Sequence, residues 1–483
     1  MSVRRSIAWS YAGQASTFAI GVVSSIILAR LLRPHDFGLF ALAQSIVGLL
    51  GLIASVGLPQ FLIREQELDQ QTLRAAFTAN LIVQGAIALP FVAVALFVAP
   101  SLGQGLQEVM LLIALTGVSN VVEFIPRSVL QREMRFRAIA STGVINAAVS
   151  ALVAIPLARQ GWGAVSIAAG LVAGKALSSA VLVAVRPTGA LMWPTFKGLR
   201  AVLVYGAQML SVTGLSQAAS RAGDLVLARL QGVAGLGTYS RAAQLHAQLF
   251  YIVYGLATGV LFAKLSEDFR RTGEIRQVYL RSVEMLPGVL WPVSLGLAIL
   301  ARPVVRLVYG PAWSESALPL SLLMVAMAIN LAVAMNWELF VLRKETARQA
   351  RYEITRSAVG LAAFVAGSWW SVAAAAAARV FEAGASYALH PPRSPPDSGC
   401  TRGELRAMYG RSAGATICAV LPSLGLMLAN GFDPLTGPGA LAAVIGGGIA
   451  LWAVALVVLR HALADEARLM LASLARRRAA PLS

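Results

Sequence analysis

The chain has 483 residues, of which 57% are hydrophobic and only 13% are charged. A soluble domain carries about 45–50% apolar and about 25% charged residues, so this composition excludes a soluble globular protein and predicts a polytopic membrane protein. The apolar runs are long and show no alternation with period two, which excludes a transmembrane β-barrel and leaves an all-α fold. A net charge of +18 could suggest nucleic acid binding, but the distribution of the charges points to another explanation.

About fourteen apolar stretches are long enough for a helix to cross a hydrocarbon core, which takes roughly 20 residues. They cover residues 7–29, 37–62, 75–99, 108–130, 138–158, 162–185, 201–224, 236–262, 278–301, 317–342, 354–370, 371–389, 412–430 and 440–459. The first stretch is too long for a cleavable signal peptide and is predicted to remain as a span. The sequence between residues 354 and 389 offers no obvious turn, and we predict two helices there, with one long bent helix as the alternative.

Lysine and arginine gather in loops on one side of the predicted spans. With the N-terminus inside, the largest basic clusters fall in inside loops and tails, at 130–137, 264–276, 343–351, 393–411 and 475–478. This positive-inside bias predicts that both termini are cytoplasmic. It explains the net charge without a nucleic acid partner. Binding of anionic lipid headgroups by one of these clusters remains an alternative role.

One short segment occurs twice. LARLLRPHDFGLF, residues 28–40, returns without a gap as LARLQGVAGLGTY, residues 227–239. The copies follow the first and seventh predicted spans, so both lie on the same side of the membrane and the halves are predicted to be parallel repeats. We expect two six-helix lobes around a central cavity, at 1–190 and 191–390. Two additional helices and a basic cytoplasmic tail follow in 391–483.

The glycines of the repeated segment are assigned a structural role. Pro34 is expected to end a helix and Gly38 to permit a tight entry into the next one, and Gly235 and Gly237 are expected to do the same in the second copy. No strand precedes either copy, so these glycines do not indicate a nucleotide-binding loop.

Several segments together resemble a known family. The pattern of residues 28–40, followed by LIASVGLPQFLIRE (52–65), is similar to the polysaccharide transporter family, which includes flippases of lipid-linked O-antigen and exopolysaccharide units. The similarity continues in 224–242 and in WPVSLGLAILARPVVRLVYGPAWSESALPLSLL (291–323), and it covers about residues 1–390. The family belongs to the superfamily of multidrug, oligosaccharidyl-lipid and polysaccharide exporters, whose members have two six-helix lobes.

This resemblance implies a function and a location. The expected substrate is an oligosaccharide linked to undecaprenyl diphosphate, which alternating access between the two lobes would move across the bacterial inner membrane. Cations lining the cavity would neutralise the diphosphate. The resemblance also implies membrane lipid and other proteins of the polysaccharide pathway as partners.

Ionisable side chains inside spans are the first candidates for the cavity, because each costs about 2.5–3.5 kcal/mol at the centre of a membrane helix and needs a partner or water. Lys175 lies in the middle of its span with no acid within one helical turn. We expect either Glu382 or a lipid diphosphate to neutralise its ammonium group.

Other charged residues are spaced to pair within one helix. Arg221 and Asp224 are three residues apart, and Glu123 and Arg127 are four apart. Arg241 shares a polar helix face with Gln244 and Gln248, which suits sugar hydroxyls or contacts between helices. The predicted cavity residues are Lys175, Arg127, Arg221, Asp224, Arg241, Arg356, Arg379, Gln14 and Gln208.

Two alternatives in the same superfamily are a cation-coupled multidrug exporter and a lipid II flippase. The first span has no acid and the cavity candidates are mostly basic, which disfavours export of cationic drugs. A membrane enzyme is disfavoured because the predicted outside loops are short and no catalytic constellation or P-loop is present. The four histidines and two cysteines show no ligand spacing, so neither a metal nor a cofactor is expected.

Overall fold

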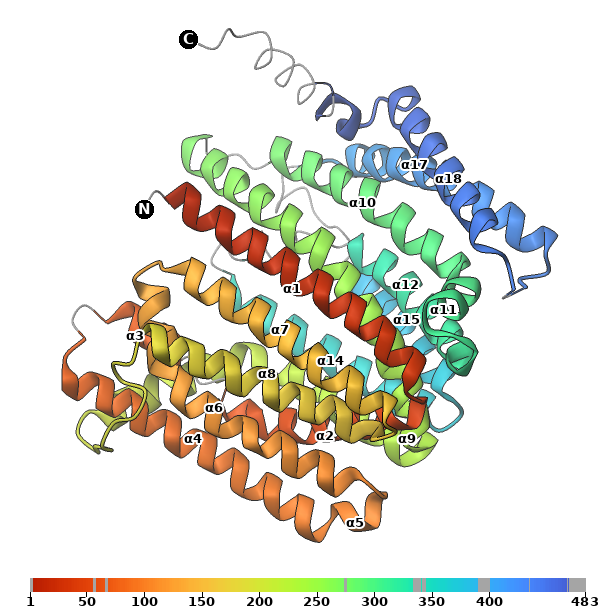
Figure 1. The fold of residues 1–483 in the computed structure, drawn as a ribbon. Helices are drawn as coiled ribbons and strands as arrows, with labels where there is room; N and C mark the ends of the chain where they lie inside the picture. The colour runs from red at the N-terminus through yellow and green to blue at the C-terminus, as the bar shows by residue number, and fades with distance from the viewer. Residues whose placement is uncertain are drawn as a thin grey trace, which may run out of the picture. The chain divides into compact units, whose positions relative to one another are not determined.

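The structure is a computed structural model, and it describes all residues except 1–2, 55–57, 66–67, 273–275, 333–339, 341–344, 390–399, 434, 467 and 469–483. Every regular element within the described residues is a helix, which confirms the all-α prediction (Figure 1). The chain divides into two compact units, Met1–Gly237 and Thr238–Ser483, here called the first unit and the second unit.

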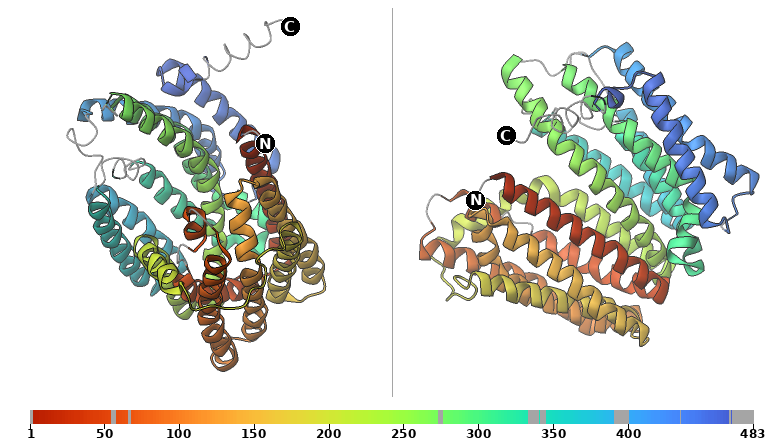
Figure 2. Two further views of the ribbon diagram at one scale, coloured as in Figure 1. Left: turned by 90° about the vertical axis from the view of Figure 1, so that its left-hand side faces the viewer. Right: turned by 45° about the horizontal axis from the view of Figure 1, so that its top comes forward.

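The first unit is a bundle of helices that run side by side (Figure 2). Helix α7 packs against both α1 and α8, while α6 packs against α4 and α8. The helices are α1 Val3–Leu31, α2 Pro34–Leu50, α3 Leu58–Arg64, α4 Gln70–Phe97, α5 Ala99–Leu102, α6 Leu106–Arg132, α7 Phe136–Arg159, α8 Gly163–Val185 and the first part of α9 Leu199–Thr272, with a short 3-10 turn η1 at Gly51–Ala54.

Local chemistry explains where α4 begins. Asp69 precedes the helix in extended conformation, and its carboxylate accepts a hydrogen bond from the backbone N–H of Thr72 at 2.7 Å. Such a cap satisfies one of the free donors of the first turn. Hydrogen bonds from the side chain and the backbone amide of Thr72 also lower the pKa of Asp69. The helix start is therefore fixed by two residues outside the apolar run.

The second unit contains the remaining part of α9 and the helices that follow. Helix α10 packs against α12 and α17, α15 against α12 and α14, and α18 against α17. The helices are α10 Arg276–Ile299, α11 Ala301–Tyr309, α12 Ala317–Leu331, α14 Thr346–Ser368, α15 Val372–Leu389, α17 Arg402–Ala429 and α18 Pro438–Val458, with a 3-10 turn η2 at Pro311–Ser316.

A buried polar cluster joins α17 and the residues that follow α18 to α10. The carboxylate of Glu284 on α10 lies 3.5 Å from Arg411 and 3.3 Å from the backbone N–H of Ala462. Ser412 donates to the carbonyl of Glu284 at 3.0 Å and lies 3.0 Å from the ring of His461. The side chains of Ser412 and His461 are fully buried. The last two helices are thus bound to the second unit by polar contacts as well as apolar packing.

Nine helices within the described residues are long and apolar enough to cross a membrane. The chain is therefore a multi-pass membrane protein, as its composition predicted. The other predicted spans, at 37–62, 201–224, 236–262, 354–370 and 371–389, do not meet this standard within the described residues, so the count of fourteen stays a prediction. The 354–389 region does form two helices, α14 and α15, with a turn at Trp369 and Trp370.

The repeated segment is built differently from the prediction. Helix α1 ends at Leu31, and Pro34 is the first residue of α2, so the proline begins a helix and does not end one. This agrees with the preference of proline for the first helical turn, where its missing N–H is not needed. In the second copy α9 continues on both sides of Gly232, which has non-helical dihedral angles (φ 77°, ψ 169°).

Gly38 and Gly237 lie within helices, where they allow two backbones to touch. A Cβ atom on Gly38 would overlap the carbonyl oxygen of Val233, and one on Gly237 would overlap the carbonyl oxygen of Pro34. All four residues belong to the first unit. Gly38 matches Gly237 in the repeat, and Pro34 matches Val233, so the two contacts are reciprocal. The predicted tight turn at these glycines was wrong, and close helix packing is the observed reason for them.

The predicted repeat boundary at 190/191 differs from the unit boundary after Gly237. The first part of α9 follows that repeat boundary, yet it packs against α2 of the first unit, as the glycine contacts show. The six-helix lobes, their arrangement around a cavity and the separate segment 391–483 stay predictions.

Candidate functional site

The first charged cluster lies between α6 and α8. The ammonium group of Lys175 on α8 is 2.5 Å from Oε1 of Glu123 on α6, and the hydroxyl of Ser179 donates to Oε2 of Glu123 at 2.8 Å. Arg127, one turn further along α6, lies 3.7 Å from the same carboxylate. Glu123 is buried, with only 8% of its surface exposed. We call Glu123, Arg127, Lys175 and Ser179 the first cluster.

The partner of Lys175 differs from the one expected. Glu382 was predicted as the protein acid, but Glu123 holds the ammonium group, while Glu382 binds two arginines of the second unit. The reason is the packing of α6 on α8, which brings together two mid-helix positions that are 52 residues apart. The predicted pairing of Glu123 with Arg127 is confirmed.

The first cluster carries an excess of positive charge. It contains one carboxylate and two cations, which leaves one positive charge that the cluster does not neutralise. The side chain of Arg127 is 49% exposed and that of Lys175 is 21% exposed, so both are more accessible than the acid between them. An accessible cation beside a neutralised acid is suited to binding an anion.

A second polar group joins α2 to α9 in the first unit. Arg221 lies 3.7 Å from Asp224, which confirms the predicted pair, and Ser45 on α2 donates to Asp224 at 2.8 Å. A Cβ atom on Gly48 would lie 2.9 Å from Nε of Arg221. The charges of Arg221 and Asp224 cancel. This group therefore supports helix packing, and its role in substrate binding stays a prediction.

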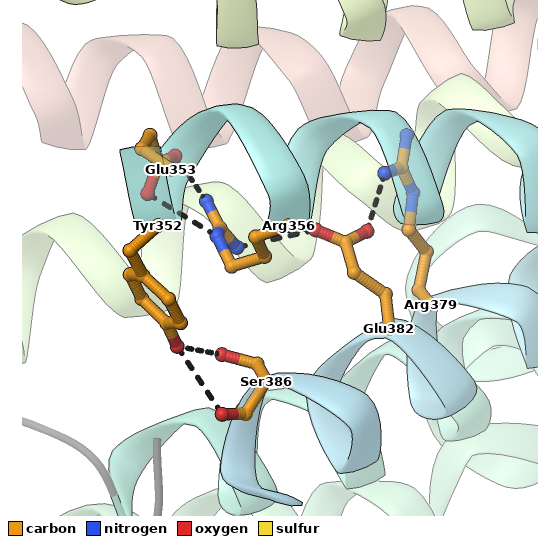
Figure 3. Close-up of polar contacts among 6 residues, drawn as sticks. All are labelled: Tyr352, Glu353, Arg356, Arg379, Glu382 and Ser386. Atoms are coloured by element: carbon orange, nitrogen blue, oxygen red, sulfur yellow. Dashed lines mark hydrogen bonds and ion pairs between the residues drawn. The ribbon is translucent and has the colours of Figure 1, made fainter. Parts of the chain in front are cut away.

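The second charged cluster lies between α14 and α15 (Figure 3). Glu382 on α15 accepts hydrogen bonds from Arg356 at 3.1 Å and from Arg379 at 2.7 Å. Arg356 also forms a 2.6 Å pair with Glu353, one turn earlier on α14. We call Glu353, Arg356, Arg379 and Glu382 the second cluster. Its two acids balance its two bases.

Neighbouring aromatic and hydroxyl groups fix the second cluster in place. Tyr352 donates a hydrogen bond to the carbonyl of Ser386 at 3.2 Å, which ties α14 to α15 beside the charges (Figure 3). The guanidinium of Arg379 lies 4.6 Å from the ring centre of Phe364 and also bonds to the side chain of Tyr239. Cation–aromatic contacts of this kind stabilise a partly desolvated arginine. Sequence reasoning missed Tyr352 and Ser386, which carry no pattern of their own.

Arg241 is held by aromatic rings. Only 2% of its surface is exposed, and its guanidinium lies 4.4 Å from the ring centre of Tyr309 and 5.7 Å from that of Trp313. It donates to Gln244 at 2.9 Å, which confirms part of the predicted polar helix face. Gln14 is exposed on α1, whereas the side chain of Gln208 lies outside the described residues. Within the part of the chain that is described, no group of three His, Cys, Asp or Glu side chains could hold a metal.

We expect Glu382→Gln to destabilise the second unit. The substitution leaves two arginines with one carboxylate, and breaking a buried ion pair by removing one partner costs about 3–5 kcal/mol. The measurement is the thermal unfolding of purified variants in detergent.

The matched control is Glu345→Gln. Among the described residues, Glu345 pairs only with the exposed Arg348, at 3.0 Å. A surface pair contributes about 0–1 kcal/mol, so this variant should unfold almost as the intact protein does. Equal stability of the two variants would contradict a structural role for the second cluster.

Comparison with known proteins identifies relatives of the chain. A family model described as polysaccharide biosynthesis protein matches residues 27–318. The succinoglycan biosynthesis transport protein ExoT of Rhizobium meliloti (strain 1021) is 27% identical over 333 residues, which cover 68% of this chain and 67% of that protein. The lipopolysaccharide biosynthesis protein WzxC of Escherichia coli (strain K12) is 24% identical over 337 residues, which cover 66% of this chain and 65% of that protein. The matched segments thus span about two thirds of each relative.

Two solved structures share the fold. A lipid II flippase MurJ in an inward closed conformation matches 93% of this chain and 98% of its own, with a TM-score of 0.72 and 12% identity. A multidrug resistance MATE family transporter of the MOP superfamily, in an inward-facing conformation, matches over 82% of this chain and 95% of its own chain. Its TM-score is 0.58 and its sequence identity is 14%. At these identities the likeness concerns the fold alone.

Proposed function

Because the chain belongs to the polysaccharide biosynthesis protein family, we propose that it is a flippase that moves a lipid-linked oligosaccharide across the bacterial inner membrane. The functions of two relatives, transport in succinoglycan biosynthesis and lipopolysaccharide biosynthesis, support this proposal. We propose undecaprenyl diphosphate as the lipid carrier, alternating access between two lobes as the means of transport, and cytoplasmic termini.

The excess positive charge of the first cluster is the observation that carries the substrate class. A lipid diphosphate brings several negative oxygens into the membrane, where an unpaired charge is costly. Arg127 is half exposed and can offer two parallel N–H donors to phosphate oxygens, while Lys175 offers a point charge. In this proposal the anion shares the two cations with Glu123, whose carboxylate balances part of their charge when the substrate is absent.

The other predicted cavity residues divide by their surroundings. Arg356 and Arg379 are neutralised by acids, and Arg241 is enclosed by rings, so we propose structural roles for these three. Gln14 and Gln208 remain proposed contacts to sugar hydroxyls. Arg221 and Asp224 remain proposed cavity residues of lower priority, since their charges cancel.

The two alternative functions, multidrug export and lipid II transport, differ in the charge that they require in the substrate site. A multidrug exporter that accepts cations would be opposed by the excess positive charge of the first cluster. A lipid II flippase would meet the same cluster with the same diphosphate chemistry, and only the glycan separates it from the leading proposal. Proteins of the polysaccharide pathway are proposed partners, in keeping with the relatives.

The test is a lipid analysis of a strain that lacks the gene. We expect diphosphate-linked oligosaccharide to accumulate on the cytoplasmic side and surface polysaccharide to disappear. The intact gene should restore export, and Arg127→Lys, which keeps the charge but loses the paired N–H donors, should restore part of it. Arg127→Gln should restore little of it, with the variant protein still present in the membrane.

Two outcomes would count against the proposal. If the deletion causes no accumulation but changes drug tolerance, the exporter becomes the better description. If Arg127→Gln restores export fully, the flippase stands but Arg127 does not bind its substrate.

A further inference from the structure

The segment between α8 and α9, residues 187–198, exposes large apolar side chains outside any helix. The exposed fractions are 78% for Leu191, 83% for Trp193 and 79% for Phe196. These three residues lie in an irregular stretch. They therefore cannot be explained as the lipid-facing side of a membrane helix.

The backbone of this segment is nevertheless bound to the first unit. The backbone N–H of Thr195 donates to the hydroxyl of Thr78 on α4 at 2.8 Å, and Thr78 is buried. Ala190 is buried, and Met192 packs on the apolar core formed by α4 and α6. Gly189 has a φ of 86°, which turns the chain where α6 comes close. The residues bound to the first unit thus lie between the three exposed apolar ones. The backbone of the segment is held in place, so the exposure of these three side chains follows from the fold.

The contact with α4 places the segment at the depth of the membrane interface. Helix α4 has 28 residues, so it is about 42 Å long, against a hydrocarbon core of about 30 Å. A centred α4 extends about 6 Å beyond the core at each end, which is about four residues. Arg74 then lies at the boundary and Thr78 about one turn inside it. The segment 187–198, which is hydrogen-bonded to Thr78, therefore lies within about one helical turn of this boundary.

Cations surround the apolar residues. Lys197, Arg200 and Arg74 are exposed, and none of them forms an ion pair with another described residue. Arg186 differs, because it pairs with Glu133 at 2.9 Å. Exposed tryptophan and phenylalanine together with lysine and arginine are the composition of a segment that lies in a membrane surface rich in anionic lipid.

We propose that residues 187–198 are an interfacial anchor, which inserts Leu191, Trp193 and Phe196 among the headgroups of an anionic leaflet and binds those headgroups through Lys197 and Arg200. With cytoplasmic termini, that leaflet is the inner one. The anchor fixes the depth of the first unit in the bilayer. It does not depend on which substrate is carried, so it stands or falls separately from the flippase proposal.

The first test measures the surroundings of Trp193. The full chain and Trp193→Phe are reconstituted in vesicles, and the difference between their emission spectra reports Trp193 alone. We expect lipids brominated near the headgroup end of the acyl chain to remove most of this difference emission, and aqueous iodide to have little effect. Trp313→Phe is the matched control, because Trp313 is fully buried and its difference emission should respond to neither quencher.

Quenching of Trp193 by iodide alone would place the segment in water, and quenching by neither agent would mean that protein covers it. Either result overturns the anchor. The second test measures energy transfer from Trp193 to dansyl-labelled headgroups. Transfer to an anionic lipid should exceed transfer to a zwitterionic lipid severalfold, and Lys197→Gln with Arg200→Gln should abolish the difference. Equal transfer in the intact chain would overturn the role of the cations.

Discussion

Replacing Lys175 by alanine is expected to lower both the stability of the protein and its transport activity. The substitution removes the 2.5 Å ion pair of Glu123 and leaves that buried carboxylate with Ser179 and the longer contact to Arg127. Breaking a buried pair by removing one partner costs about 3–5 kcal/mol. The two remaining contacts of Glu123 favour a loss of unfolding free energy near the lower end of that range.

A double substitution separates the two effects. Lys175→Ala combined with Glu123→Ala removes both charges, so much of the stability should return. Transport should stay low, because the cation proposed to bind the diphosphate is still absent. The measurements are thermal unfolding in detergent and the amount of surface polysaccharide in a deletion strain carrying each variant.

Glu123→Gln is the matched single variant. It also breaks the pair, but it keeps the ammonium group, so transport per folded molecule should be retained. If the double variant recovers transport together with stability, Lys175 serves only to neutralise Glu123, and its place in the substrate site must be given up.

Gly38→Ala is expected to disrupt the packing of α2 against α9. The added methyl group would overlap the carbonyl oxygen of Val233, and a backbone atom cannot rotate away as a side chain can. Overpacking typically costs about 1–3 kcal/mol, and a clash between two helix backbones belongs at or above the upper end. Gly237→Ala should cost a similar amount, because its contact with Pro34 is the reciprocal one. The melting temperature of each purified variant measures the loss.

Gly85→Ala provides the control for this pair. Gly85 is also a helical glycine, but a Cβ atom there would meet nothing within 4 Å. Its replacement should be neutral or stabilise α4 by up to about 1 kcal/mol, because alanine favours helix more than glycine does. Equal melting temperatures for Gly38→Ala and Gly85→Ala would refute the close contact.

The sequence was informative wherever structure depends on neighbours along the chain. Apolar runs predicted α4, α6, α7 and α8 because each has to cross the bilayer by itself. Spacings of three and four residues predicted the pairs of Arg221 with Asp224 and Glu123 with Arg127, since such positions share a helix face. Family membership followed from several segments in order, although no single one was specific.

Contacts between different helices could not be predicted from spacings along the chain. Nothing in the spacing of Glu123 and Lys175 indicates that they meet, because the meeting depends on how α6 and α8 are rotated against each other. The glycines of the repeat were recognised, but their structural role was predicted wrongly. Close packing of two backbones and a tight turn both favour glycine because it has no side chain, so the sequence does not distinguish them.

The course of α9 also bears on how the gene could be divided. By sequence this helix opens the second repeat, yet the residues up to Gly237 belong by packing to the first unit, and the backbone continues into the second unit after one non-helical residue at Gly232. A cut at the repeat boundary would separate α2 from the stretch of α9 that it packs against, and leave Gly38 without the carbonyl it adjoins. The predicted repeats and the compact units thus differ by the part of α9 up to Gly237, and neither predicted repeat contains all the contacts of the first unit.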